Sequence, residues 1–469
     1  MSRLKAPVGG CTVRMYRQGL GDCFLLAFGA TQRSQKYVLI DCGVLLGTSN
    51  AEDTMRKVVT NIHQCTGGHL DALVVTHEHW DHVSGFMQAQ REFGKIKVDK
   101  IWLSWAEDPN NPLARELRER RKAALQRVQM ALSAAASAPP LFNQRIKSLS
   151  EFFGINLGAT GRATTEDALD WVKAQWTNPH YCDTGKVPLT IDGLPEVKFY
   201  VLGPPASTSY IRKSSPSKKT GDVYLDDAVS GQLGLYLAAL GSAPMWRQTP
   251  QVKEKLKPFS SAYEFEPYGV DPLIKPLIDK YLSEPWRKID ADWTGAAGEL
   301  ALKLDAHTNN TSLVLAIELA PKDKVLLFPG DAQVGNWLSW DEVKWDGQAK
   351  DMTARDLLER TVLYKVGHHG SHNATLREKG LERMINQELV AFISVNRAIA
   401  RDMKWRMPYE PLYSRLKEKT LGRVVLSDAG VPIACDDVAV ESFRKLSAQT
   451  DLYCEYTIMP WKPGNNNSK

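Results

Sequence analysis

The first hundred residues alternate between short apolar segments and polar turns. Three of these segments, at 11–16, 23–28 and 37–40, have the length and apolar content of strands. Apolar residues with helical spacing at 55–65 predict an amphipathic helix, and the apolar run at 73–75 predicts a buried strand after it. Strands followed by a helix and another strand predict an α/β layer arrangement that is rich in strands.

The rest of the chain has two patterned regions with a long, weakly patterned stretch between them. A strand at 96–105 and a basic amphipathic helix at 112–136 come first, and Pro139 and Pro140 end that helix. Apolar segments predict further strands at 197–202, 312–319, 324–328, 362–366 and 391–395, and a closing strand and turn at 421–430. Residues 139–300 are the least informative part of the chain, with no repeat or motif in 223–300, and we expect 139–300 to be an insertion or cap region.

Length, charge and cysteine usage narrow the class of protein. The 469 residues exceed the usual size of one domain, and 43% hydrophobic with 24% charged residues are typical of a folded chain. The net charge of +5 favours an anionic partner only weakly, because it is far below the charge density of a protein that coats nucleic acid. No secretion signal and no segment long enough to cross a bilayer is found, so we expect a cytoplasmic protein without a membrane partner. Seven scattered cysteines without a CxxC pair predict reduced, mostly buried thiols.

A dense cluster of metal-binding residue types follows the apolar run at 73–75. Three histidines and an aspartate occur within the six residues 77–82, HEHWDH, whereas the whole chain has only ten histidines. Imidazole nitrogens and carboxylate oxygens suit zinc, manganese or iron, and the end of a rigid strand can hold them in place. The alternative is a polar surface turn with solvated histidines, which the position directly after a buried strand argues against.

Carboxylates and histidines also stand at the ends of other predicted strands. Asp22 lies in the turn GLGD, Asp41 ends the strand at 37–40, and Asp331 follows the strand at 324–328. The strand at 362–366 runs into GHHGSH at 367–372. For Asp22 and Asp41 a role in capping a turn is an equal alternative, because aspartate is common in turns.

Together these motifs resemble the metallo-β-lactamase superfamily. HxHxDH is its signature, and GLGDCFLL, YVLIDCG and HHGS resemble the β-lactamase-like domain of ComEC, a DNA-uptake protein. The resemblance implies a four-layer αββα fold with a large central insertion. Residues 1–138 and 301–469 would form the two halves of that fold, and 139–300 the insertion.

The resemblance also implies two divalent metal ions, Zn²⁺ or Mn²⁺. His77 and His79 would bind the first ion, Asp81 and His82 the second, and Asp331 would bridge them. One of His368 and His369 would complete the second site, with a slight preference for His368. Asp22 and Asp41 would lie close to the ions. One departure concerns a further histidine found in many members, because NNTS stands at 309–312 instead and leaves the first ion with fewer protein ligands.

Two ions with a bridging carboxylate and a water between them favour hydrolysis, and phosphodiesters fit such a site well. Asp81 would orient the water, and His369 or His372 would stabilise or protonate the leaving group. Lys365, Ser371 and Arg397 are weaker candidates for binding substrate, and for Lys365 and Arg397 a plain surface role is the stronger alternative.

Three functions remain open from the sequence. The first is a nuclease acting on DNA, supported by the resemblance, the basic charge balance of the chain and a basic loop at 207–222. The second is a hydrolase of a small ester, lactone, thioester or nucleotide. The third is a binding module with a structural or degenerate metal site, although a structural zinc needs no bridging carboxylate. A nuclease would need restraint, so control by a protein partner or by a protease cutting near Lys218 or Lys219, in defence against foreign DNA, is a further hypothesis. The oligomeric state is left open.

Overall fold

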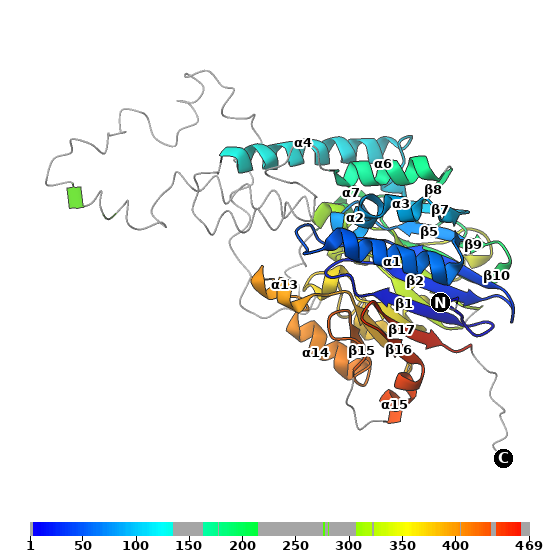
Figure 1. Cartoon of the computed structure of the whole chain (residues 1–469). Coiled ribbons are helices and arrows are strands. Elements are labelled where there is room, and N and C mark those ends of the chain that lie inside the picture. Colours follow the sequence, from blue (N-terminus) through cyan, green and yellow to red (C-terminus); the bar gives the residue numbers. More distant parts are fainter. Residues whose placement is uncertain are drawn as a thin grey trace, which may run out of the picture.

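Two β-sheets face each other, and helices cover the outer face of each (Figure 1). This computed structural model describes residues 3–134, 163–176, 178–213, 275–276, 280, 306–320, 323–403, 405–432 and 438–460. In Figure 1, helices α4 and α6 lie at the top and helices α13, α14 and α15 at the bottom. The arrangement is mixed α/β and consistent with the metallo-β-lactamase fold, so the predicted fold class is confirmed.

The first sheet has eight strands in the order β16-β17-β1-β2-β3-β5-β7-β8. Its strands are β1 (Cys11–Tyr16), β2 (Phe24–Gly29), β3 (Gln35–Ile40), β5 (Ala72–Val75), β7 (Ile101–Ser104), β8 (Pro179–Cys182), β16 (Ser447–Gln449) and β17 (Tyr453–Ile458). From β16 to β3 neighbours are antiparallel, and from β3 to β8 they are parallel. The pairing of β17 with β1 brings the last described strand back beside the first.

The second sheet has seven strands in the order β15-β14-β13-β12-β11-β10-β9. Its strands are β9 (Leu189–Ile191), β10 (Leu194–Gly203), β11 (Val314–Glu318), β12 (Val325–Phe328), β13 (Thr361–Lys365), β14 (Val390–Ile393) and β15 (Val424–Leu426). Strands β12 to β15 are parallel, and β9 to β12 are antiparallel. A small separate pair joins β4 (His69–Leu70) to β6 (Lys97–Val98).

Helices fill the outer layers. The first sheet carries α1 (Ala51–Thr66), α2 (Trp80–Gln88), α3 (Gln90–Phe93) and α6 (Thr165–Gln175). The second sheet carries α11 (Val334–Ser339), α12 (Ala354–Glu359) and α14 (Glu410–Lys419). The remaining helices are α4 (Pro112–Ala134), α7 (Thr208–Ile211), α13 (Arg397–Asp402) and α15 (Val438–Lys445), with short 3-10 turns such as η1 (Trp105–Glu107) and η10 (His368–Gly370).

The main core lies between the sheets. Phe24 of the first sheet meets Phe328 of the second edge to face, with ring centroids 5.5 Å apart, and Phe28 meets Phe199 at 5.9 Å. Burying each such ring contributes roughly 1.5–3 kcal/mol, and an aromatic pair adds about 0.5–1.5 kcal/mol. This packing fixes the two sheets against each other and gives the loops at their ends a rigid base.

The region predicted to be an insertion contributes to the fold itself. Helix α6 and strand β8 belong to the first sheet's layers, and strands β9 and β10 belong to the second sheet, although all fall within 139–300. Most of 139–300 and the loop segment 214–222, including Lys218 and Lys219, lie outside the described residues. The six described cysteines are buried and form no disulfide, as predicted. None of the helices in the described ranges has the length and hydropathy that a membrane span requires.

Candidate metal centre

The candidate metal ligands gather at one end of the two sheets, where parallel strands finish. Asp41 follows β3, the HEHWDH segment follows β5, Asp331 follows β12, and the two histidines of η10 follow β13. Because neighbouring parallel strands end at the same edge of a sheet, the loops after them converge there. The sandwich packing then places the loops of the first sheet against those of the second.

Four buried side chains form the densest cluster, which we call the DHDH cluster: Asp81, His82, Asp331 and His369. One ligand atom from each lies within 4.8 Å of all the others. His369 Nε2 lies 2.8 Å from Asp81 Oδ2, and His82 Nε2 lies 3.2 Å from Asp331 Oδ2. Asp81 Oδ1 is buried without a hydrogen-bond partner. Two imidazoles and two carboxylates are donors that Zn²⁺ and Mn²⁺ accept, and an unsatisfied buried oxygen is what a cation would stabilise.

Two further imidazoles lie beside the DHDH cluster. His77 Nε2 is 3.1 Å from His79 Nδ1, and the ring centroids of His77 and His82 are 4.2 Å apart. Burial lowers the pKa of His77 well below its usual value and that of His79 to about 3. Both rings are therefore neutral at pH 7, as a metal ligand must be.

The segment NNTS has a structural role in place of a third histidine. The Oδ1 atom of Asn310 accepts hydrogen bonds from the backbone N–H groups of Gln333 and Asn336. Its Nδ2 donates to the carbonyl oxygens of Ile211 and Lys213. Asn310 thus ties α7 to the start of α11, and Ser312 Oγ accepts the backbone N–H of Asp331 at 3.2 Å.

Asp41 orients His82. Its Oδ2 lies 2.8 Å from His82 Nδ1 and accepts the hydroxyl of Thr76 at 2.7 Å, while its Oδ1 accepts the Thr76 backbone N–H at 2.8 Å. With Nδ1 held by a carboxylate, His82 points Nε2 into the DHDH cluster, which is how metal-binding histidines are usually oriented. Asp22 contributes from the other side, where its backbone N–H donates to the Asp81 carbonyl at 3.0 Å.

Two glycines allow the backbone to approach the HEHWDH loop this closely. A Cβ on Gly43 would lie 2.4 Å from the Asp81 carbonyl carbon. A Cβ on Gly21, whose φ is +147°, would lie 2.6 Å from the Asp81 carbonyl oxygen. Any larger residue at either position would push Asp22 or Asp41 away from the centre.

Lys365 is buried at the centre, so the alternative of a plain surface role is wrong. Its Nζ donates to the Gly330 carbonyl at 2.8 Å, lies 3.3 Å from Asp331 Oδ1 and forms an ion pair with Asp22. Only 1% of the side chain is exposed. Although burial opposes it, the carboxylates of Asp22 and Asp331 raise the pKa of Lys365, so the ammonium stays charged.

The two adjacent histidines of η10 have different surroundings, and His369 is the one in the DHDH cluster. His369 Nδ1 lies 2.7 Å from the Ser394 carbonyl, which turns Nε2 toward Asp81. His368 donates its backbone N–H to Asp331 Oδ1 at 3.1 Å, and its Nδ1 lies 2.9 Å from Ser371 Oγ. Both residues have positive φ, 42° and 54°, so they form a turn and do not alternate as strand residues would.

The remaining predicted substrate residues are spread around this turn. Ser371 is buried and bonded to His368 and to Asn373 Oδ1 at 3.0 Å. His372 is at the surface, with its ring centroid 6.0 Å from that of Tyr409. Arg397 is about half exposed and pairs through Nε with Asp428 Oδ2 at 2.9 Å. Of these three side chains, His372 is therefore the exposed one that lies next to η10 in the chain.

The electrostatics of the centre are dominated by buried carboxylates. Although burial opposes the charged imidazolium, Asp331 and Asp81 raise the pKa of both His82 and His369. Burial likewise opposes ionisation of Asp331, but His82 and Lys365 hold its pKa well below the usual range. These acids therefore favour the protonated form of both histidines as long as no cation is bound.

The residues that sequence reasoning missed surround the ligands. Thr76 binds Asp41, and the Ser394 carbonyl orients His369. The sequence does contain an indication that Lys365 points inward. Leu363, two residues earlier on β13, belongs to the core between the sheets, and strand residues two apart share a face. For Thr76 and Ser394 no signal in the sequence singles them out.

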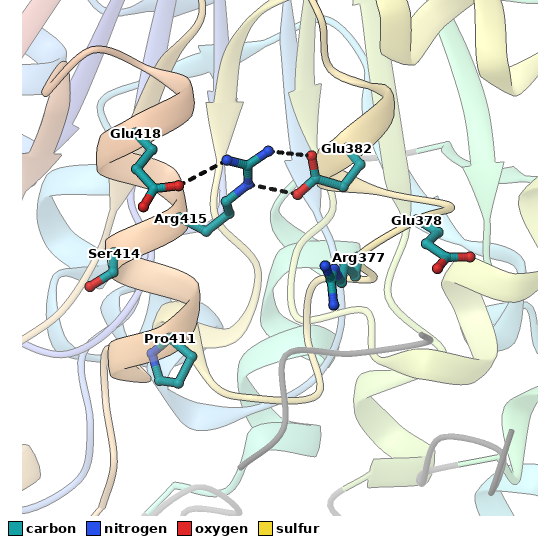
Figure 2. Close-up of a pocket in the computed structure, with 7 residues that line it drawn as sticks. All are labelled: Arg377, Glu378, Glu382, Pro411, Ser414, Arg415 and Glu418. Carbon is teal, nitrogen blue, oxygen red and sulfur yellow. Dashed lines mark hydrogen bonds and ion pairs between the residues drawn. The ribbon is translucent and has the colours of Figure 1, made fainter. Parts of the chain in front are cut away.

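A separate hollow of about 510 Å³ lies beside α14 (Figure 2). Arg415, one of its lining residues, pairs with Glu382 and with Glu418, and Lys419 also pairs with Glu382. None of the predicted site residues lines this hollow.

The comparisons with known proteins agree with the motifs. Residues 17–121 match the family model described as metallo-beta-lactamase superfamily, a span that includes Asp22, Asp41 and the whole HEHWDH segment. This superfamily is generally hydrolytic and typically binds divalent metals, which indicates a metal-dependent hydrolase. No curated protein and no solved structure matches the chain.

Proposed function

We propose that this chain, which carries a metallo-β-lactamase superfamily domain, is a metal-dependent phosphodiesterase that cleaves DNA. The observation that carries the proposal is the DHDH cluster. Its four side chains come from positions up to 288 residues apart and from both sheets, yet their ligand atoms lie within 4.8 Å. A bound cation would both balance the carboxylates and orient the four groups held so closely.

The charge of the centre supports two divalent ions. Four buried carboxylates, on Asp22, Asp41, Asp81 and Asp331, face the single ammonium of Lys365. With neutral imidazoles this leaves three negative charges, which two divalent cations and one hydroxide would neutralise. His77 and His79 would hold one ion, Asp81, His82 and His369 would hold the second, and Asp331 would contact both. When bound, such a pair supplies hydroxide near neutral pH and stabilises negative charge on a phosphoryl oxygen.

The residues of the chain have separate tasks in this proposal. Asp81, with Oδ1 not yet hydrogen-bonded, is placed to orient the attacking water. His369 uses both ring nitrogens within the protein, so a role at the leaving group passes to His372. Partial burial and the charge of Arg406 lower the pKa of His372, so its neutral ring suits a hydrogen bond to substrate better than proton donation.

A DNA substrate is supported by the basic balance of the chain and by the residues around η10. His372, Arg401 and Arg406 are exposed on the segments that border this turn. Helix α4 contributes less than its sequence predicts, because Arg118 and Arg121 bond to groups inside the protein. The resemblance to the ComEC-type domain favours DNA over a small ester. Restraint by a partner or protease, in defence against foreign DNA, belongs to the same proposal.

The direct test uses purified protein with Mn²⁺ or Zn²⁺ on plasmid and single-stranded DNA. The wild type should degrade DNA, and the His79→Ala and Asp331→Ala proteins should not. Equal cleavage by the wild type and both variants would refute the proposal. Intact DNA together with metal-dependent hydrolysis of bis-nitrophenyl phosphate or a simple ester would instead assign a small-molecule substrate.

A further inference from the structure

A group of four ionisable side chains, of which the two acids are buried, connects the HEHWDH segment to two helices of the outer layer. We call it the Glu78 charge cluster: Glu78, Glu107, Arg121 and Lys173. Arg121 Nη2 lies 2.6 Å from Glu78 Oε2 and 3.8 Å from Glu107 Oε1, and Lys173 Nζ lies 4.0 Å from Glu107 Oε2. The four residues, two acidic and two basic, come from the HEHWDH segment, η1, α4 and α6.

Glu78 is not a metal ligand in the proposed function, but it lies between two residues that are. It stands between His77 and His79, but its side chain pairs with Arg121 of α4. The side chains of Glu78 and Arg121 are only 10% and 11% exposed. A charge pair this far from water is weakened little by solvent and salt, unlike the exposed Arg120–Glu116 pair on the same helix.

Helix α4 is itself firmly seated, so it can act as a support for the loop. Arg118 donates to the carbonyl oxygens of Glu107 and Asp108 at 3.0 and 3.3 Å. Ala114 packs in a small apolar group with Trp105, Ala106 and Ile211. The position of Arg121 is therefore set by contacts that do not involve the loop.

We propose that Arg121 is a positioning residue for the metal centre. By holding Glu78, it fixes the backbone between His77 and His79 and so sets how the two imidazoles are presented to the first ion. The effect is strongest at that ion because the DHDH cluster has Asp41 and Lys365 as supports of its own. This inference rests on the proposed function only in that the loop binds a metal, and it does not depend on the substrate.

Loss of Arg121 would leave Glu78 and Glu107 as two buried acids balanced by Lys173 alone. The loop would then move to bring Glu78 to water, carrying His77 and His79 with it. Removing a group that orients metal ligands typically lowers affinity about 10–100-fold, and we expect the lower end here because Glu78 acts through the backbone.

The test measures metal binding, not cleavage. Affinity is obtained by competition with a chelator, and the visible spectrum of the Co²⁺-loaded protein reports the ligand geometry. Arg121→Gln and Glu78→Gln should each lower affinity about tenfold and alter the Co²⁺ spectrum, and the double variant should be no worse than either single. Arg121→Lys should recover most of the affinity.

Arg120→Gln is the matched control, because Arg120 neighbours Arg121 on α4 and pairs with the exposed Glu116. It should behave as the wild type. A folded Arg121→Gln protein with wild-type affinity and Co²⁺ spectrum would overturn the inference, as would additive losses in the double variant. If Arg121→Gln does not fold, an unchanged Glu78→Gln protein overturns it equally. A wild type that binds metal but leaves DNA intact would refute the proposed substrate without touching this result.

Discussion

Lys365 contacts one oxygen of the buried Asp331 carboxylate and leaves the other oxygen facing the histidines. Lys365 Nζ lies 3.3 Å from Asp331 Oδ1, which also accepts the His368 backbone N–H, while Oδ2 lies 3.2 Å from His82 Nε2. One oxygen is thus held by the protein and the other faces the ligands. A carboxylate arranged in this way can offer a single oxygen to two cations.

Lys365→Met should destabilise the metal-free protein more than the metal-loaded protein. Removing one partner of a buried ion pair costs about 3–5 kcal/mol, because the remaining carboxylates are left uncompensated. Bound cations would compensate them, so metal should raise the melting temperature of the variant more than that of the wild type. Thermal unfolding with and without Mn²⁺ measures this. The control is Lys324→Met, whose partner Glu388 is exposed, and an equal metal effect in Lys365→Met and wild type would contradict the role given to Lys365.

Metal binding should release protons at pH 7. Carboxylates raise the pKa of His82 and His369, yet both must be neutral to bind a metal. Because their folded pKa values lie above the unfolded value of about 6.5, their stabilisation is complete below pH ~6.5 and is lost as pH rises through the folded pKa. The metal-free protein should therefore lose stability above pH ~6.5.

Calorimetric titration of metal in two buffers of different ionisation enthalpy counts the protons released. At least one proton per chain is expected. Binding without proton release, together with a metal-free stability that is constant above neutral pH, would show that these histidines are not protonated before metal binds.

His369→Ala should lose metal, and His368→Ala should largely keep it. His369 Nε2 faces Asp81 in the DHDH cluster, whereas His368 Nδ1 is held by Ser371. We expect the loss of affinity to be at least about tenfold greater for His369→Ala, measured by chelator competition. The two variants control for each other because they alter neighbouring residues of one turn. A greater loss of metal affinity in His368→Ala would show that His368 is the ligand, as the sequence analysis slightly preferred.

Asp41→Asn should weaken metal binding without removing a ligand. The amide keeps the shape of the side chain but no longer matches both His82 Nδ1 and the Thr76 hydroxyl as a carboxylate does. A loss of about 10–100-fold in affinity is expected. Glu318→Gln, a buried carboxylate paired with Arg360 in the other sheet, should leave affinity unchanged. Equal affinity of Asp41→Asn and wild type would show that His82 needs no such support.

The sequence predicts the elements of the centre because its ligands stand at the ends of apolar strands. The strand at 11–16 coincides with β1, and the runs before Asp41, Asp331 and the two adjacent histidines are strands with ends shifted by one or two residues. Parallel neighbours then bring those ends together. The local sequence pattern is sufficient to locate these ligands because the strand before each of them fixes its position.

Features that depend on contacts between distant segments are not predictable in this way. The direction of His368 and His369 follows from two positive φ values in a turn, which period-two reasoning cannot supply. The bond between Asn310 and the start of α11 explains why that segment lacks a ligand, but it joins residues of different elements. The strand predicted at 197–202 lies within β10, whereas β8 and β9 are not predicted because their burial is only partial at several positions.

The central claim is that residues from both sheets hold a pair of cations through Asp331. Bound-metal analysis of the wild-type and Asp331→Ala proteins, after loading with Mn²⁺ or Zn²⁺ and removal of free metal, tests it most directly. The account predicts two ions per chain in the wild type and a loss of both sites' tight binding in Asp331→Ala. Less than one ion per wild-type chain, with no recovery on adding metal, would contradict it.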